Sequence, residues 1–272
     1  MKEALTRSLT GALFVAVIVL SLLIHEWLYL SLFCLISILA WVEYVNLFPV
    51  AMRSGLKISG AILNVSVFVS VFFIASYRVN HLIFILPVFI LTVIVLQDQI
   101  NRIQLWKQRL FIIFSGMLYL ALPLSLLHIM AWGLDKGGNY SYRWILYTLI
   151  FLWTYDTMAY VSGRLAGRHT IWKRISPRKT WEGAIGGVVF VLGLAFIMSG
   201  LVYDLSFLEW CWFGLIAAVT GTIGDFFESW LKRKAGLKDS GKILPGHGGV
   251  LDRFDSLLFS TPFITLYLYL VL

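Results

Sequence analysis

The chain alternates between long apolar runs and short polar stretches over nearly its whole length. About 20 apolar residues are needed for a helix to cross a bilayer, and nine runs come close to that length. The predicted spans are 9–25, 27–48, 58–77, 82–97, 110–132, 143–163, 184–203, 207–231 and 252–272. The pattern therefore predicts an all-α polytopic membrane protein with about nine transmembrane helices.

The basic residues indicate how these predicted spans are oriented. When successive loops are assigned to alternate sides, all of the 22 Lys and Arg residues except Arg78, Lys136 and Arg143 fall on one side. Because cytoplasmic loops are enriched in Lys and Arg, that side is predicted to be cytoplasmic. The N-terminus is then cytoplasmic and the C-terminus lies outside.

Composition favours a membrane protein over a nucleic-acid-binding one. The 272 residues are 60% hydrophobic, 16% aromatic and only 13% charged, about half the charged fraction of a soluble domain. The net charge of +8 comes from loop residues, which membrane orientation, anionic lipids and nucleotide phosphates explain better than nucleic acid. Cys34 and Cys211 lie in apolar runs without metal-ligand spacing, so neither a disulfide nor a zinc site is expected.

Polar residues concentrate in the second half of the chain, after a weak boundary near residue 140. We therefore divide the chain into a scaffold of transmembrane helices, 1–140, and a catalytic transmembrane region, 141–272. The cytoplasmic loops of the catalytic region are predicted at 164–183 and 232–251.

The most polar stretch, 229–255, contains four lysines, two arginines, three aspartates, a histidine and five glycines. A solvated loop that only fixes membrane orientation is the alternative, but the Pro-Gly-His-Gly-Gly turn before Asp252 goes beyond that role. Gly248 and Gly249 let the backbone approach a ligand closely. His247 either donates to a phosphate oxygen or braces the loop.

Several carboxylates lie in or beside the predicted spans, where an ionised one costs about 2.5–3.5 kcal/mol and needs a partner or a purpose. Asp225, in the eighth span, is either a metal ligand or half of a buried pair with Lys or Arg. Asp252 and Asp255 share one helical face, whereas Arg253 points elsewhere, toward an anion. Mg²⁺ takes one or two carboxylates and fills its shell with water and substrate phosphates. These acids beside clustered basic residues therefore favour phosphoryl or nucleotidyl transfer.

A second polar stretch runs from Asp156 to Gly183. Asp156, Tyr160 and Arg164 recur every four residues on one face of the sixth span, and Lys179 precedes the seventh. A basic interfacial loop explains the charges of 164–183 but not a carboxylate inside the span. Glu43, in the second span, is interpreted as a buried partner or a neutral acid.

Together these residues resemble the phosphatidate cytidylyltransferases, also called CDP-diacylglycerol synthases. The family pattern is matched without departure by Ser229, Lys232, Arg233, Lys238, Asp239, Pro245, His247, Gly248, Gly249, Asp252, Arg253 and Asp255. Upstream, Asp156-x-x-Ala-Tyr-x-x-Gly-Arg and Ser176-Pro-x-Lys-Thr-Trp-Glu-Gly183 also look like the family. The resemblance covers about 150–272 strongly, whereas the first half agrees only in being a set of spans.

The resemblance implies transfer of CMP from CTP to phosphatidate, giving CDP-diacylglycerol and pyrophosphate, in phospholipid biosynthesis. It implies Mg²⁺ bound by Asp225 and Asp252, with a second, monovalent cation left open, and a homodimer in the inner (plasma) membrane with its active site facing the cytoplasm. The catalytic residues expected are Asp225, Asp252, Asp255, Lys232 and Arg233. The substrate-binding residues expected are Lys238, Lys242, His247, Gly248, Gly249, Arg253, Asp156, Arg164 and Lys179.

Two alternatives from other classes stay open. One is a CTP-dependent polyprenol or dolichol kinase, which the full His-Gly-Gly-x-x-Asp-Arg-x-Asp motif disfavours. The other is a cation-coupled transporter that uses Asp156 and Asp225 as ion sites. A CDP-alcohol phosphotransferase would be expected to show Asp-Gly-x-x-Ala-Arg, which the sequence lacks.

Overall fold

The computed structural model describes residues 2–49, 55–77, 79–134, 138–241, 243 and 248–272. The chain forms two compact units. The first unit comprises Met1–Tyr142 and Ala235–Phe254, and the second comprises Arg143–Lys234 and Asp255–Leu272. A sequence segment from the second half of the chain, 235–254, therefore folds with the N-terminal helices.

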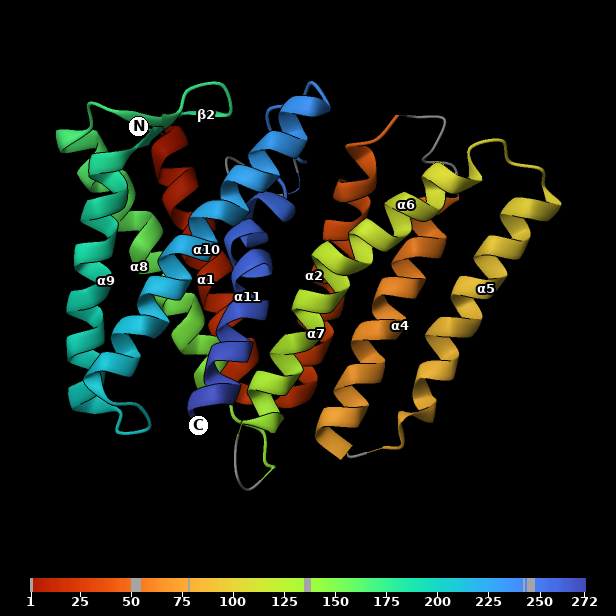
Figure 1. The fold of residues 1–272 in the computed structure, drawn as a ribbon, viewed down its shortest axis with the longest axis horizontal. Coiled ribbons are helices and arrows are strands. Elements are labelled where there is room, and N and C mark those ends of the chain that lie inside the picture. Colours follow the sequence, from red (N-terminus) through yellow and green to blue (C-terminus); the bar gives the residue numbers. More distant parts are fainter. Residues whose placement is uncertain (1, 50–54, 78, 135–137, 242, 244–247) are drawn as a thin grey trace. The chain divides into compact units, whose positions relative to one another are not determined.

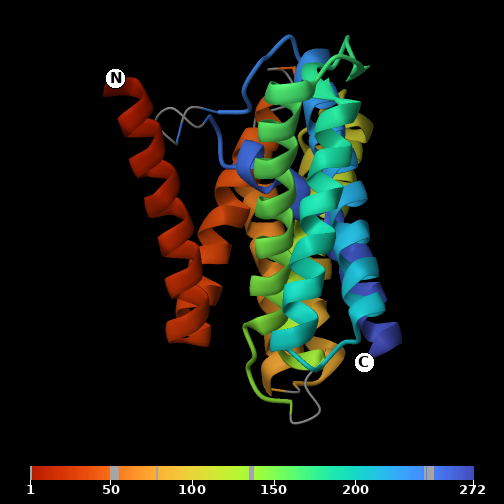
Figure 2. The same cartoon turned by 90° about the vertical axis from the view of Figure 1, so that its left-hand side faces the viewer.

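The described elements of the first unit are helices. Its helices are α1 (Lys2–Ile24), α2 (Glu26–Asn46), α4 (Leu56–Tyr77), η1 (His81–Phe84), α5 (Ile85–Ile100), α6 (Trp106–Gly116), η2 (Met117–Ala121), α7 (Leu122–His128) and η3 (Ile129–Gly133). The last four form one helical run interrupted by the π-helical turns η2 and η3. Figure 2 shows α1 and α2 as a hairpin joined near His25, whose ring accepts a hydrogen bond from the backbone of Trp27 and so begins α2.

The core of the first unit is aromatic. His128, at the end of α7, is fully buried among Tyr29 of α2, Phe68 and Phe72 of α4, and Trp132 of η3. Its Nδ1 lies 3.0 Å from the hydroxyl oxygen of Tyr29. Helices that are apolar on most faces bury large side chains wherever they meet, and these rings fill the space between α2, α4 and α7.

The second unit contains α8 (Arg143–Ala166), β1 (Thr170–Trp172), β2 (Ser176–Thr180), α9 (Trp181–Leu201), α10 (Phe207–Lys234) and most of α11 (Leu251–Val271). Helices α8, α9 and α10 run alongside one another (Figure 1). At Gly183 a Cβ would lie 2.6 Å from the carbonyl oxygen of Ala159, so glycine allows α9 to approach α8. The antiparallel hairpin β1–β2 pairs Thr170 with Thr180 and joins the two helices.

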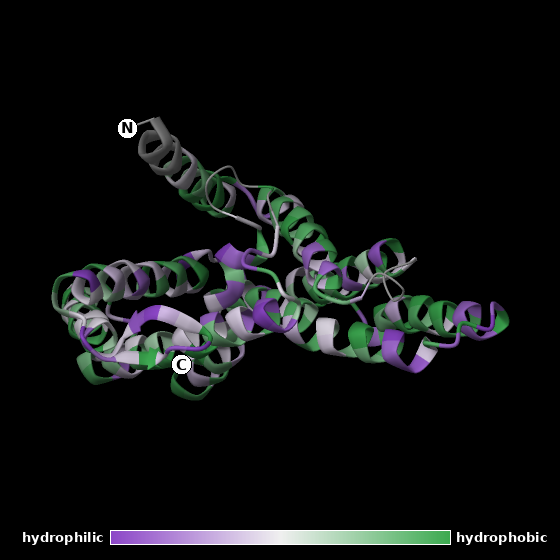
Figure 3. Cartoon of the chain, turned by 90° about the horizontal axis from the view of Figure 1, so that it is seen from above, coloured by the Kyte–Doolittle hydropathy of each residue, from purple (hydrophilic) through white to green (hydrophobic). Residues whose placement is uncertain are grey.

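Seven helical runs in the described part of the chain are long and apolar enough to cross a membrane. They are Glu26–Asn46, Leu56–Tyr77, His81–Ile100, Trp106–Gly133, Trp181–Leu201, Phe207–Lys234 and Leu251–Val271. In Figure 3 the hydrophobic colour predominates along the helices, and the hairpin carries hydrophilic colour. The prediction of an all-α polytopic membrane protein is confirmed.

Nine spans were predicted, and seven of the described helical runs are long and apolar enough to cross a membrane. Each of the nine predicted spans falls on a helix, with edges displaced by a few residues. The first corresponds to a shorter apolar segment, Thr10–Ile24, and the sixth to α8, which is long enough but more polar than the seven. The count of nine and the orientation of the termini therefore stay predictions.

Candidate active site

An ion pair joins the hairpin to α10 in the second unit. Lys179, near the end of β2, places its Nζ 2.5 Å from Oδ2 of Asp225. Ser229, one turn further along α10, donates its hydroxyl to Oδ1 of Asp225 at 3.3 Å. The two charged side chains are 27% and 30% exposed, so the pair is accessible from the surface of the unit. One of the two interpretations of Asp225 was an ion pair with Lys or Arg. The structure shows such a pair, with Lys179.

Two further carboxyl groups lie near this pair. Asp255 of α11 is buried, and the charges of Asp225, Asp156 and Lys179 all act on it. Its Oδ1 accepts a hydrogen bond from the backbone of Ser256 at 2.7 Å. Elements α8, β2, α10 and α11 thus contribute Asp156, Lys179, Asp225 and Asp255 to one set of interacting charges. Neighbouring carboxylates repel one another, and an added cation relieves that repulsion.

The oxygen donors of this cluster suit magnesium, which prefers carboxylate and water ligands. In the described residues, however, no group of three or more His, Cys, Asp or Glu side chains is arranged closely enough to hold a metal ion. The two predicted ligands also belong to different units, Asp225 to the second and Asp252 to the first. The donor chemistry fits Mg²⁺, and the ligand assignment stays a prediction.

The C-terminal end of α10 carries the basic residues expected to bind phosphate. Lys232 is buried and forms an ion pair with Glu228, one turn earlier on the same helix. Arg233 is exposed, as is Arg164 at the end of α8. Positive side chains at a helix C-terminus also complement the helix dipole. The end of α10 therefore combines one shielded ammonium with exposed guanidinium charge.

In the first unit, the loop before α11 wraps around the carboxylate of Asp252. Its Oδ2 accepts hydrogen bonds from the backbone of Gly249 at 2.7 Å and of Ser240 at 3.1 Å. Gly248 has a φ of +83°, and a Cβ there would lie 2.6 Å from the same oxygen. These hydrogen bonds orient the carboxylate, whose oxygens are the type of ligand that Mg²⁺ prefers.

Four more residues near this loop were predicted to bind substrate. Lys238 and Arg253 are exposed. His247 and Lys242 were expected to bind substrate and lie outside the described residues.

Glu43 of α2 has partners that its position in an apolar run did not indicate. This side chain is buried and accepts hydrogen bonds from the loop that carries Gly249. The sequence did show a carboxylate inside an apolar run. Such a carboxylate is costly in a membrane and usually has a partner or a function. Nothing in the sequence near Glu43 indicated that its partners lie some 200 positions later.

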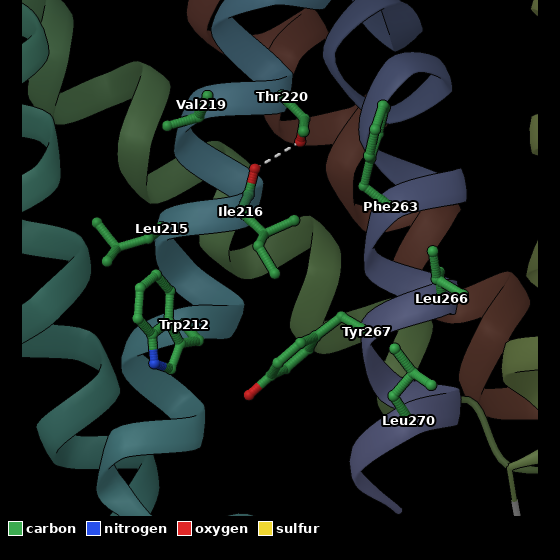
Figure 4. Close-up of a pocket in the computed structure, with 9 residues that line it drawn as sticks. All are labelled: Trp212, Leu215, Ile216, Val219, Thr220, Phe263, Leu266, Tyr267 and Leu270. Carbon is green, nitrogen blue, oxygen red and sulfur yellow. Dashed lines mark hydrogen bonds between the residues drawn. The ribbon is translucent and has the colours of Figure 1, made fainter.

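An apolar groove lies between α10 and α11 in the second unit (Figure 4). It has a volume of about 420 Å³ and is lined by Trp212, Leu215, Ile216, Val219, Thr220, Phe263, Leu266, Tyr267 and Leu270. The hydroxyl of Thr220 is directed to the carbonyl oxygen of Ile216 in its own helix. The groove thus offers hydrocarbon contacts and no charge, so it suits an apolar chain and does not suit a triphosphate.

Fold and site together define a polytopic α-helical membrane protein with clustered carboxylates, lysines and arginines. The model of the Cytidylyltransferase family matches residues 5–271, and the chain belongs to that family. This confirms the relationship expected from the motifs at Asp156–Gly183 and Ser229–Asp255.

Curated relatives include bacterial phosphatidate cytidylyltransferases. The protein of that name from Staphylococcus haemolyticus (strain JCSC1435) is 45% identical over 127 residues, which cover 46% of this chain and 49% of the relative. The one from Staphylococcus aureus (strain COL) is 45% identical over 128 residues, with the same coverage. The chain spans about half the length of the curated relatives it matches.

Proposed function

We propose that this protein is an Mg²⁺-dependent nucleotidyltransferase that transfers CMP from CTP to phosphatidate, forming CDP-diacylglycerol and pyrophosphate. The observation that carries the proposal is the family match over residues 5–271. The sequence of this chain also contains every residue of the family signature. The similarity to proteins named phosphatidate cytidylyltransferases supports the choice of substrates.

The reaction asks for positioning and charge neutralisation rather than for a protein nucleophile. An oxygen of the phosphatidate monoester forms a bond to the α-phosphorus of CTP. The bond from that phosphorus to the oxygen bridging to the β-phosphate breaks, and pyrophosphate leaves with the electron pair. Both reactants are anions, so the enzyme must hold them together against their repulsion.

Lys and Arg side chains supply that neutralising charge. Lys232, which is buried and paired with Glu228, and the exposed Arg233 hold phosphate oxygens during transfer. The other substrate-binding residues in the proposal are Lys238, Lys242, His247, Gly248, Gly249, Arg253, Asp156, Arg164 and Lys179. Gly248 and Gly249 have no side chains and so let the triphosphate approach the backbone closely.

The carboxylates hold the metal in this proposal. Asp225 and Asp252 each supply a ligand oxygen, and Asp255 lies three residues after Asp252 in α11. When bound, Mg²⁺ supplies charge stabilisation at the α-phosphate and at the departing pyrophosphate. The support is the Lys179–Asp225 ion pair and the electrostatic influence of Asp225 and Asp156 on Asp255. A second, monovalent cation is compatible with this excess of carboxyl groups.

The remaining assignments concern the membrane. We propose nine spans with the N-terminus in the cytoplasm and the C-terminus outside, because nearly all basic residues then lie on the cytoplasmic side. The active site faces the cytoplasm, the membrane is the inner (plasma) membrane, and the protein acts as a homodimer.

Labelled CTP tests the proposed reaction. With α-³²P-CTP, phosphatidate and Mg²⁺, purified protein is expected to place label in the lipid fraction, and γ-³²P-CTP is expected to place none. Label in lipid from γ-³²P-CTP alone would mean attack at the γ-phosphorus and hence a kinase. No lipid label from either nucleotide, together with ion flux in vesicles, would mean a transporter.

A further inference from the structure

Glu43 of α2 is bonded to the loop that precedes α11, although about 200 residues separate them in sequence. Its Oε1 accepts a hydrogen bond from the backbone of Val250 at 3.0 Å. Its Oε2 accepts from the backbone of Leu251 at 2.8 Å and from the hydroxyl of Ser240 at 3.0 Å. The residue is 2% exposed. All four residues belong to the first unit, so this arrangement is internal to one compact body.

The loop is shaped around this carboxylate. A Cβ at Gly241 or at Gly249 would collide with the carboxyl group of Glu43. Because Gly241 and Gly249 have no Cβ, the backbone at both positions can approach the carboxyl group of Glu43 closely. An acid that only needed burial in a span would not require two glycines from a distant segment.

Glu43 and Asp252 hold the same loop through different donors. Ser240 donates its hydroxyl to Glu43 and its backbone N–H to Asp252. Gly249 donates its N–H to Asp252, while the next two residues donate theirs to Glu43. Leu251 is the first residue of α11, where helix N–H groups have no acceptor within the helix and favour a negative group. Glu43 therefore determines where α11 begins, and Asp252 is the second residue of that helix.

We propose that Glu43 is a positioning residue, which holds Ser240 and the backbone of Val250–Leu251 so that the Asp252 carboxylate and the Gly248–Gly249 backbone are oriented for metal and phosphate. This inference rests on the proposed function. Glu43 does not touch substrate or metal in this role. It acts through Ser240 and the N-terminus of α11, in the way that groups behind a metal ligand orient it.

Glu43→Gln tests the role, with Asp98→Asn as the matched control. Gln keeps the size of the side chain but directs an NH₂ donor at groups that are themselves donors. Asp98 of α5 is a buried carboxylate of the same unit, bonded at 2.8 Å to Nε of Arg109 and remote in sequence from the loop. Both variants remove one buried carboxylate, so both are expected to lower thermal stability.

Three measurements on intact detergent-solubilised protein separate the two roles. They are amide hydrogen exchange at Ser240, Gly249, Val250 and Leu251, the Mg²⁺ concentration for half-maximal CMP transfer, and the thermal midpoint. Glu43→Gln is expected to speed exchange at these amides and to raise the half-saturating Mg²⁺ about 10–100-fold, the usual consequence of losing a group behind a metal ligand. Asp98→Asn is expected to leave both unchanged.

Ser240→Ala provides a milder variant in case Glu43→Gln does not fold. It removes one donor to Glu43 and keeps the backbone N–H that Asp252 accepts, so exchange and Mg²⁺ requirement should move in the same direction by a smaller factor. Unchanged exchange and Mg²⁺ requirement in a folded Glu43→Gln or in Ser240→Ala would overturn the proposal. So would a parallel loss of stability and turnover in Glu43→Gln and Asp98→Asn at an unaltered Mg²⁺ requirement.

Hydrogen exchange also separates this inference from the proposed reaction. If wild-type protein transfers no CMP but Mg²⁺ protects the loop amides in wild type and not in Glu43→Gln, the reaction assignment is wrong and the positioning role stands. If CMP is transferred and Glu43→Gln behaves as wild type in exchange and Mg²⁺ requirement, the reaction stands and the positioning role is wrong.

Discussion

Replacing Asp225 by Asn distinguishes the two interpretations of this carboxylate. As an ion-pair partner, Asp225 holds Lys179 at 2.5 Å and stabilises the contact between β2 and α10. As a cation ligand, it contributes charge to the reaction. Asn keeps the size and polarity of the side chain and removes its charge. The two roles therefore predict losses in different properties, one in stability and the other in turnover.

The structure sets the expected size of each loss. Lys179 and Asp225 are each about a third exposed or less, and such a pair contributes about 0.2–1 kcal/mol because solvent screens it. A change of 1 kcal/mol shifts the thermal midpoint of a chain of roughly this size by about 2–4 °C. Loss of a group that stabilises transition-state charge lowers kcat on the order of 10²–10³-fold, about 2.7–4 kcal/mol. A cation ligand therefore predicts a large kinetic loss beside a small thermal one.

The assay compares Asp225→Asn, Lys179→Met, the double variant and Asp204→Asn. The last removes the carboxylate of another ion pair of the second unit, at 3.0 Å to Arg143, and serves as the control. We expect Asp225→Asn to lose at least about 100-fold in turnover, Lys179→Met to lose less, and Asp204→Asn to match wild type. Thermal midpoints of all four should lie within a few degrees of wild type.

Equal losses would refute this reasoning. If Asp225→Asn and Lys179→Met reduce turnover to the same extent and the double variant is no worse than either, the two residues act as one unit. The carboxylate would then act only through Lys179, and Asp225 would not be a cation ligand.

Three further predictions concern the metal and the topology. Asp252→Asn should abolish turnover in membrane-inserted protein, because the amide lacks charge and its NH₂ cannot accept from Gly249; near-normal turnover would remove Asp252 from the metal site. Chelation with EDTA should stop CMP transfer and added Mg²⁺ should restore it, whereas activity that persists in EDTA contradicts the proposed metal. A tag at Leu272 should react with an impermeant label on intact cells; labelling only after the cytoplasmic side is opened would contradict an external C-terminus.

The amino-acid sequence by itself determined where the helices lie. Each predicted span falls on a helix, and the last was predicted from 252 and begins at Leu251. In a membrane the backbone must satisfy its hydrogen bonds within the segment, so a long apolar run has few alternatives to a helix. The motif residues could be singled out for a similar reason, because charges and glycines stand out in a chain that is 60% hydrophobic.

Only the tertiary structure decided which of these residues meet. The sequence indicated a polar loop at 164–183, and the fold turns part of it into the hairpin that brings Lys179 to Asp225. It indicated a carboxylate at Glu43, and the fold bonds it to residues 197 to 208 positions away. Periodicity and spacing report on neighbours within one or two turns of a helix. Partners from distant segments depend on how whole helices pack, and no local pattern carries that information.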